Sequence, residues 1–274
     1  MSLGSTLGPV LRSTTKATAA AVDRVRPPRP GITILIYHRI GSGTGGQMDL
    51  RVDDFERQLE WLRSTQRIIT LDRAVAEVTG TEPLQPGVVV TFDDGTADWV
   101  EHVLPVLDRL HVPATFYVAT AFVEGRRAFP GEGRPISWAG LKEMSTSRLV
   151  TLGSHTHTHA LMDRLPVPDI ADELDRSIGL LGDRVGVDPT HFCYPKALLG
   201  SPPAQAAIRE RFRSATLAGT RSNTRGADPY RLARSPIQAA DGQRWFRHKA
   251  VGGLGFEDMV RDRLNALRYR GATE

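Results

Sequence analysis

The sequence contains a single cysteine, Cys193, among 274 residues. An internal disulfide and a metal site built from several cysteines are therefore both excluded. No apolar run is long enough to cross a bilayer. The N-terminus carries basic residues but lacks the continuous apolar core that a secretion signal needs. From these absences we expect a cytoplasmic protein without a transmembrane segment.

The sequence also has little excess charge. It contains 35 basic and 31 acidic residues, which give a net charge of +4 spread along the chain. So small an excess does not predict a nucleic-acid-binding surface. Hydrophobic residues at 40% and charged residues at 24% are ordinary for a globular protein with a substantial core.

A stretch rich in proline and glycine, "RPPRPG" (Arg26–Gly31), separates the N-terminus from the rest. Such a stretch is a poor helix or strand, so we divide the chain into a tail (residues 1–30) and one folded domain (residues 31–274). The tail is expected to be loosely ordered. The alternative is a short amphipathic helix around Ala17–Val22 that touches a membrane surface or a partner.

Apolar strand candidates alternate with helical patterns through the domain. A helix is expected to begin at Asp53 or Asp54 as N-cap, and a later one to stop at Gly186. This alternation predicts a parallel α/β sheet, and seven candidates favour closure into a barrel. The strand candidates are residues 32–37, 88–92, 114–118, 149–153, 191–194, 213–217 and 231–237.

Two adjacent acids, Asp93 and Asp94 in "TFDDGTADW", follow the second strand candidate. In parallel α/β folds, ligands and catalytic groups gather at the C-terminal ends of strands. Adjacent carboxylates repel each other, and their burial is costly unless a cation compensates. The motif therefore predicts either a cation site or, as the simpler alternative, a loop with a helix cap.

Three histidines, His155, His157 and His159, lie within "GSHTHTH" at the end of the fourth strand candidate. His155 and His159 share a face if the segment turns helically, whereas His157 points elsewhere. Two imidazoles and one carboxylate are typical of a zinc or similar site that leaves positions for water and substrate. Histidine clusters also occur on surfaces, so both interpretations stay open at this point.

The motifs "TFDDG" and "SHTHTH", in this order, resemble the first two motifs of the polysaccharide deacetylases with a NodB-homology domain. The similarity continues through "ILIYHRI", "ATFYVAT", "ISWAGLKEM" and "FCYPKALLG", over about residues 32–240. The resemblance implies a distorted (β/α) barrel of about seven parallel strands. It also implies metal-dependent removal of an acetyl group from the nitrogen of an amino sugar.

The resemblance assigns roles to the motif residues. Asp93 is implied as the catalytic base, while Asp94, His155 and His159 are implied as ligands of a divalent metal. Zinc is the first expectation, with cobalt or nickel as alternatives. His157 falls at a variable position of the family motif.

The chain departs from the family pattern in the residue that protonates the leaving amine. The usual late Leu-x-His motif is missing, and His248 in "FRHKAV" is a poor match. The opening "LIYHRI" is similar instead to the branch that takes this histidine from its first strand. His38 is therefore the candidate acid, and the alternative is a histidine that only packs beside Tyr37.

The third motif also departs, because Cys193-Tyr194-Pro195-Lys196 stands where relatives often carry Arg-x-Pro-Tyr-Gly. The backbone N–H of Lys196 is expected to donate to the oxyanion. Arg234 is the candidate for the missing arginine that pairs with the base, and the alternative is an exposed position or an interaction with a helix dipole. Cys193 is expected to be a small buried residue rather than a nucleophile.

The expected substrate is an N-acetylated carbohydrate: a polysaccharide, a glycolipid precursor or a glycoside. Two alternatives remain, namely a hydrolase of the same fold acting on a non-carbohydrate amide, and an inactive carbohydrate-binding relative. Trp99, Trp138 and Tyr194 are candidates for an aromatic sugar platform, and each could equally belong to the core. The sequence predicts no oligomeric state.

Overall fold

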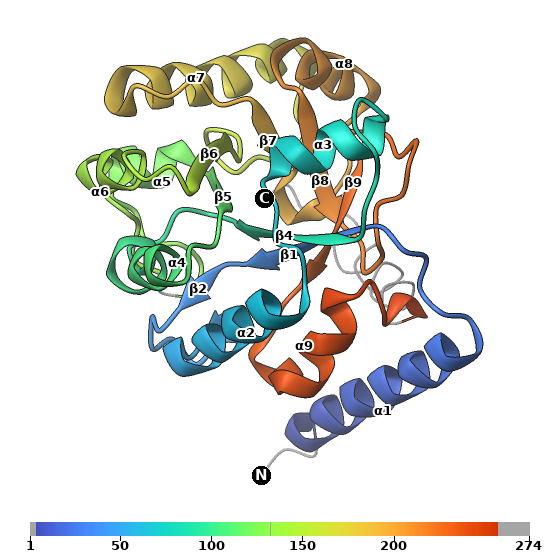
Figure 1. Cartoon of the computed structure of the whole chain (residues 1–274). Helices are drawn as coiled ribbons and strands as arrows, with labels where there is room; N and C mark the ends of the chain where they lie inside the picture. The colour runs from blue at the N-terminus through green and yellow to red at the C-terminus, as the bar shows by residue number, and fades with distance from the viewer. Residues whose placement is uncertain (1–3, 132, 257–274) are drawn as a thin grey trace.

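Seven parallel strands close into a barrel in the computed structural model, which describes residues 4–131 and 133–256 (Figure 1). The barrel order is β1-β4-β5-β6-β7-β8-β9, and β9 pairs back onto β1. The predicted parallel barrel is therefore confirmed. Its strands are β1 (Ile32–Tyr37), β4 (Gly87–Phe92), β5 (Ala114–Val118), β6 (Val150–Ser154), β7 (His191–Cys193), β8 (Ser214–Ala218) and β9 (Leu232–Pro236).

Strands β1, β4 and β5 form where the sequence has short, largely apolar runs. Every residue of β1, β4, β5 and β9 is buried, as expected of parallel strands covered by helices on one face and filled by side chains on the other. All seven candidates match strands to within about one residue at each end, because burial on both faces gives each strand a clear signal.

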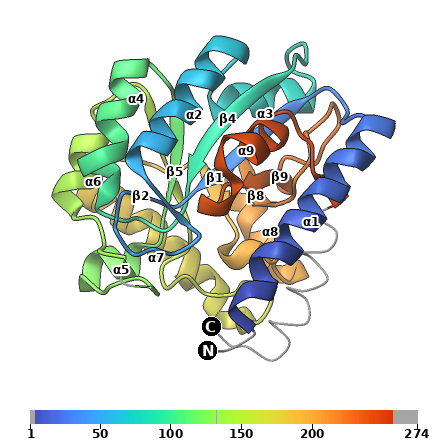
Figure 2. The same ribbon diagram turned by 90° about the horizontal axis from the view of Figure 1, so that it is seen from below.

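Helices connect the strands and surround the barrel (Figures 1 and 2). Helix α7 ends at Gly186, whose φ of 82° permits the left-handed cap that was predicted there. Helix α2 begins earlier than predicted: Arg51 occupies the N-cap position, so Asp53 and Asp54 lie in the first turn. In the first turn, the negative charges of both acids still interact favourably with the positive end of the helix dipole. The helices along the domain are α2 (Val52–Thr65), α3 (Leu71–Thr79), α4 (Leu104–Leu110), α5 (Thr120–Gly125), α6 (Trp138–Met144), α7 (Val167–Val185), α8 (Pro202–Arg211) and α9 (Gly242–Ala250).

Several short elements have no signal in the sequence pattern. Strands β2 (Arg39–Ile40) and β3 (Asp49–Leu50) form a separate two-stranded parallel sheet. A π-helical turn, η1 (Trp99–Val103), leads into α4, and short 3-10 turns occur at η2 (Pro195–Ala197) and η3 (Ala239–Asp241). Elements of two to five residues are too short to show a hydrophobic period.

The N-terminal segment forms a long helix, α1 (Gly4–Val25), which lies against the outside of the barrel near α9 (Figure 2). Ala19 and Ala20 pack with Trp245 and Leu254, and the buried Lys16 pairs with Asp241. The structure thus gives this segment a helix, which was the stated alternative to a loosely ordered tail. None of the described helices is both long and apolar enough to span a membrane.

An aromatic cluster anchors the strand that leads into the Asp-Asp motif. Phe92, the last residue of β4, stacks on Phe116 with ring centroids 4.7 Å apart and on Tyr37 at 5.4 Å. Trp99 closes the cluster at 4.9 Å from Phe116 and is fully buried. Aromatic packing of this kind fixes the position at which the chain leaves the strand.

Candidate active site and metal centre

The strand register brings the predicted site residues to one end of the barrel. Tyr37 pairs with Phe92, so His38 and Asp93 leave neighbouring strands at the same level. Val118 likewise pairs with Ser154, and the N–H of His155 donates to the carbonyl of Val118 at 3.0 Å. The motifs that lie far apart in the sequence therefore meet at the C-terminal ends of the strands.

Asp94, His155 and His159 form one compact group of potential ligands. Their ligand atoms all lie within 4.8 Å of one another. Oδ1 of Asp94 is 3.8 Å from Nε2 of His155 and 3.7 Å from Nε2 of His159. Ligands that bind one ion at about 2 Å each have separations close to these.

The histidine protonation states suit metal binding. Nδ1 of His155 is 2.8 Å from the carbonyl oxygen of Cys193, which can only accept, so Nδ1 carries the proton and Nε2 keeps its lone pair. Burial lowers the pKa of His155. Burial and the nearby His155 lower the pKa of His159 to about 3. Both rings are thus neutral near pH 7, and the residues fit a divalent ion that accepts nitrogen and oxygen ligands.

Two of the potential ligands occupy backbone conformations that are uncommon for residues other than glycine. Asp94 has a φ of 87° and His159 a φ of 65°. Such conformations cost free energy and persist only where the surroundings fix them. At Asp94 the carbonyl accepts a hydrogen bond from the N–H of Ala119 at 2.9 Å. The cost points to a functional requirement at these positions.

Residues that the sequence analysis missed hold the histidine loop. The carboxylate of Glu173, on α7, accepts hydrogen bonds from the N–H and the hydroxyl of Thr158 at 2.5 and 3.0 Å. Nδ1 of His157 is 2.9 Å from the hydroxyl of Thr120, so His157 faces α5 and lies outside the ligand group. These contacts depend on tertiary packing and have no local sequence signal.

The side chain of Asp93 is held by a buried arginine. Arg234, on β9, donates from its two terminal nitrogens to Oδ1 at 2.6 Å and to Oδ2 at 2.7 Å. Burial alone would raise the pKa of Asp93, but the guanidinium charge and its hydrogen bonds lower it well below its usual range. Asp93 therefore remains a carboxylate, and Arg234 lies where the predicted partner of the base is needed.

His38 and Lys196 lie near these groups. The charge of His38 contributes to the lowered pKa of Asp93, and its buried Nδ1 has no hydrogen-bond partner among the residues that the structure describes. Its carbonyl accepts a hydrogen bond from the indole of Trp99 at 3.0 Å. Lys196 has a φ of 53°, and its charge helps to lower the pKa of His159. His248 lies instead on α9, where it lines a separate surface hollow.

The aromatic candidates for a sugar platform belong mostly to the core. Trp99 and Tyr194 are 0% and 1% exposed, and Trp138 packs against the main hydrophobic cluster. A partly exposed ring beside the ligand group is that of Phe122, centred 6.5 Å from the ring of His159 and stacked on Phe129 at 4.2 Å. Phe122 lies in an unremarkable apolar stretch, so nothing in the sequence pointed to it.

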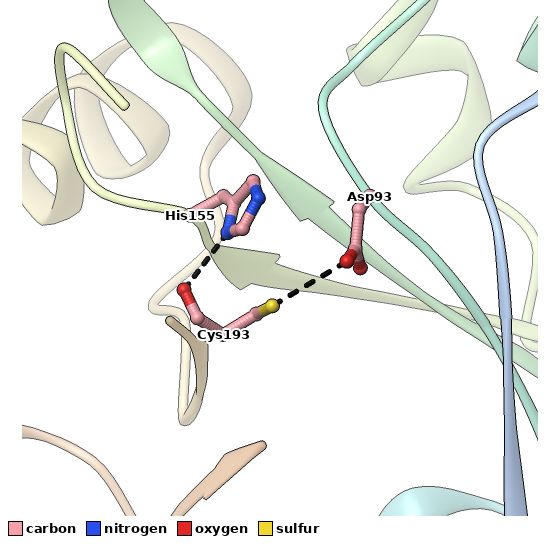
Figure 3. A group of neighbouring side chains, drawn as sticks. All are labelled: Asp93, His155 and Cys193. Carbon is pink, nitrogen blue, oxygen red and sulfur yellow. Dashed lines mark hydrogen bonds between the residues drawn. The ribbon is translucent and has the colours of Figure 1, made fainter. Parts of the chain in front are cut away.

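A second set of potential ligand atoms, from Asp93, His155 and Cys193, also lies within 4.8 Å (Figure 3). An ion there would compete with the guanidinium of Arg234, which already contacts both Asp93 and the Cys193 sulfur. It would also share His155 with the first group. Burial raises the pKa of the Cys193 thiol well above its usual value, so the thiol stays protonated and a second independent metal site is disfavoured.

Comparisons with known proteins agree with this geometry. Residues 81–212 match the family model described as polysaccharide deacetylase. YxkH of Bacillus subtilis (strain 168), a protein assigned to the polysaccharide deacetylases, is 22% identical over 79% of this chain and 74% of its own length. The poly-beta-1,6-N-acetyl-D-glucosamine N-deacetylase of Escherichia coli (strain K12) is 26% identical over 47% of this chain, a match that covers 21% of that relative.

Solved structures show the same fold. IcaB from Ammonifex degensii superposes with a TM-score of 0.72 at 27% identity, over 82% of this chain and 98% of IcaB. The Streptococcus pyogenes deacetylase PplD, solved in complex with acetate, gives a TM-score of 0.70 at 19% identity, over 81% of this chain and 99% of PplD. The motif residues meet at one end of the shared barrel, and the chain matches the polysaccharide deacetylase family in residues 81–212 and shares the fold of these deacetylases.

Proposed function

We propose that this protein is a metal-dependent hydrolase that removes an N-linked acetyl group from an amino sugar in a polysaccharide, a glycolipid precursor or a glycoside. The observation that carries the proposal is the pairing of two features. Asp94, His155 and His159 form a three-ligand group, and the neighbouring carboxylate of Asp93 is held outside that group by Arg234. One acid is thus available as a ligand and the other as a base.

Asp94, His155 and His159 would hold the divalent ion. We propose zinc, although two imidazoles and a carboxylate also accept cobalt or nickel. When bound, such an ion supplies Lewis-acid chemistry: it polarises the amide carbonyl and makes water more acidic. The lowered pKa of Asp93 makes it a weak base, and a weak base is effective only toward acidified water.

The chain's own residues supply the proton transfers. Asp93 accepts the proton of the attacking water, and Arg234 keeps its carboxylate in place. The N–H of Lys196 donates to the oxygen that gains negative charge. His38 gives a proton to the departing nitrogen, because an amide anion is a very poor leaving group. The position of His38 directly after β1, level with Asp93 after β4, supports this role.

The test is acetate release from a panel of N-acetylated amino sugars, from monosaccharide to polymer. The protein is assayed after metal removal and after reconstitution with zinc, cobalt or nickel, with Asp93→Asn as the matched control. The proposal predicts acetate release that depends on the metal and on Asp93. No release from any acetylated amino sugar by the metal-loaded protein would overturn it and favour a non-carbohydrate amide or a binding role.

A further inference from the structure

Cys193 contacts both His155, one of the potential ligands, and Asp93, the proposed base (Figure 3). Its backbone carbonyl accepts the hydrogen bond from Nδ1 of His155 at 2.8 Å. Its sulfur lies 2.7 Å from a terminal nitrogen of Arg234 and 3.5 Å from Oδ2 of Asp93. The side chain is fully buried at the end of β7. One residue therefore joins the two halves of the site.

The direction of each hydrogen bond follows from the chemistry of the groups. The guanidinium nitrogen of Arg234 can only donate, so the sulfur accepts from it. The thiol proton then has two acceptors within reach, Oδ2 of Asp93 at 3.5 Å and the carbonyl of Tyr194 at 3.6 Å. The charged carboxylate is the stronger acceptor, so the thiol donates to Asp93.

These contacts make the two oxygens of Asp93 unequal. Oδ2 accepts from both Arg234 and the thiol. Within the described part of the chain, Oδ1 accepts only from Arg234, at 2.6 Å. A carboxylate oxygen has two acceptor positions, so Oδ1 is the oxygen with a position left for a water proton.

We infer that Cys193 is a positioning residue for the base. Its thiol occupies the second acceptor position of Oδ2 of Asp93. This holds the carboxylate in the orientation in which Oδ1 can accept the proton of the water. The backbone carbonyl of Cys193 also fixes the tautomer of His155, one of the proposed ligands. The inference rests on the proposed function and deepens it. It gives a task to a side chain that the sequence analysis took to be only a small buried residue.

The kinetic test compares Cys193→Ala with Cys193→Ser. Loss of one hydrogen bond predicts a kcat about threefold to tenfold lower for Cys193→Ala, with KM and metal content unchanged. Cys193→Ser keeps a donor and an acceptor and should recover most of that loss. Ser235→Ala is the matched control, because Ser235 is fully buried beside Arg234 and its hydroxyl has no partner among the described residues; its kcat should not change.

A second readout does not need activity. The protein has one thiol, so its S–H stretching band in the infrared spectrum belongs to Cys193 alone. Asp93→Ala removes the acceptor and should shift the band to higher frequency. An unshifted band, or an unchanged kcat in Cys193→Ala, would overturn the inference. If no substrate is found, the proposed function fails while the infrared result still decides the thiol contact; if acetate is released without a band shift, only this inference fails.

Discussion

Two buried carboxylates, Asp93 and Glu77, look alike by charge and burial but differ in what surrounds them. Glu77 lies on α3, near the start of β4, and is fully buried. Hydrogen bonds from Arg67 and then Arg73 lower its pKa to about 2, against the opposing effect of burial. Asp93, at the other end of the same strand, is also held ionised by an arginine.

The difference is in the unfilled acceptor positions. Each oxygen of Glu77 accepts two hydrogen bonds: Oε1 from Arg67 and Arg73, and Oε2 from Arg67 and the N–H of Gln85. Among the residues that the structure describes, none fills the second acceptor position of Oδ1 in Asp93, and Asp93 lies beside the group of potential ligands. An ion pair or a lowered pKa is therefore a weak indicator of an active site, because structural networks produce both. Asp93 differs from Glu77 in having an open acceptor position and potential metal ligands beside it.

The largest expected effect is the difference in kcat between variants of the two carboxylates. Asp93→Asn should lower kcat about 10²- to 10⁴-fold, since it removes a general base, while metal content stays near that of the wild type. Glu77→Gln should leave kcat unchanged. Steady-state acetate release and metal analysis check both variants. Loss of the metal in Asp93→Asn would instead exchange the roles of Asp93 and Asp94.

The next largest effect is expected for His38, the proposed acid that acts together with Asp93. His38→Ala should lower kcat about 10²-fold or more if His38 protonates the leaving amine. His248→Ala, on α9 and outside the site, serves as the control and should retain the wild-type rate. A His38→Ala protein with full activity would leave only the packing role for this histidine.

The next prediction compares the metal affinity of two histidine variants, one inside the proposed ligand group and one outside it. His159→Ala should weaken metal binding by at least about 100-fold, because changes to outer partners of a ligand already cost about 10- to 100-fold. His157→Ala should keep the metal, since His157 hydrogen-bonds to Thr120. Competition with a chelator measures both affinities. Equal losses in the two variants would argue against the assigned ligand set.

The smallest effect tests Glu77 as a structural residue. Its pKa is lowered on folding from 4.5 to about 2, so its ion pairs stabilise the fold above pH 4.5 and this stabilisation is lost as the pH falls toward 2. Glu77→Gln should lower Tm at pH 7 by several degrees, at about 2–4 °C per kcal/mol for a chain of this size. The difference from the wild type should shrink between pH 4.5 and 2. A constant difference in calorimetric scans would contradict the assignment.

The barrel could be predicted from the sequence because most of its strands are buried along their whole length. The runs at 32–37 and 88–92 are apolar except for one threonine each, and a parallel sheet places such runs side by side. The metal group could be proposed because its residues lie in two short motifs, each at the end of a strand. Helix α1 was expected only as a short alternative around Ala17–Val22, because its core contacts are made by small residues, Ala19 and Ala20, which give a weak apolar pattern.

The remaining parts of the site depend on contacts between distant segments. The pairing of Arg234 with Asp93 joins residues 141 positions apart and was expected only through the family resemblance. Glu173 reaches the histidine loop from α7 and had no signal at all. Cys193 gives no sign in the sequence of its contacts with Asp93 and Arg234. Local pattern identifies the residues that carry chemistry. Of the residues that hold them, Arg234 could be proposed from the resemblance, whereas the contacts of Glu173 and Cys193 become visible only when the barrel closes.

Anomalous X-ray scattering from crystals of the zinc-loaded protein tests the central claim most directly. The account predicts one peak bonded to Asp94, His155 and His159, with Asp93 still paired to Arg234 and outside the coordination sphere. A peak bonded to Asp93 and Cys193, or no peak at either group, would contradict it.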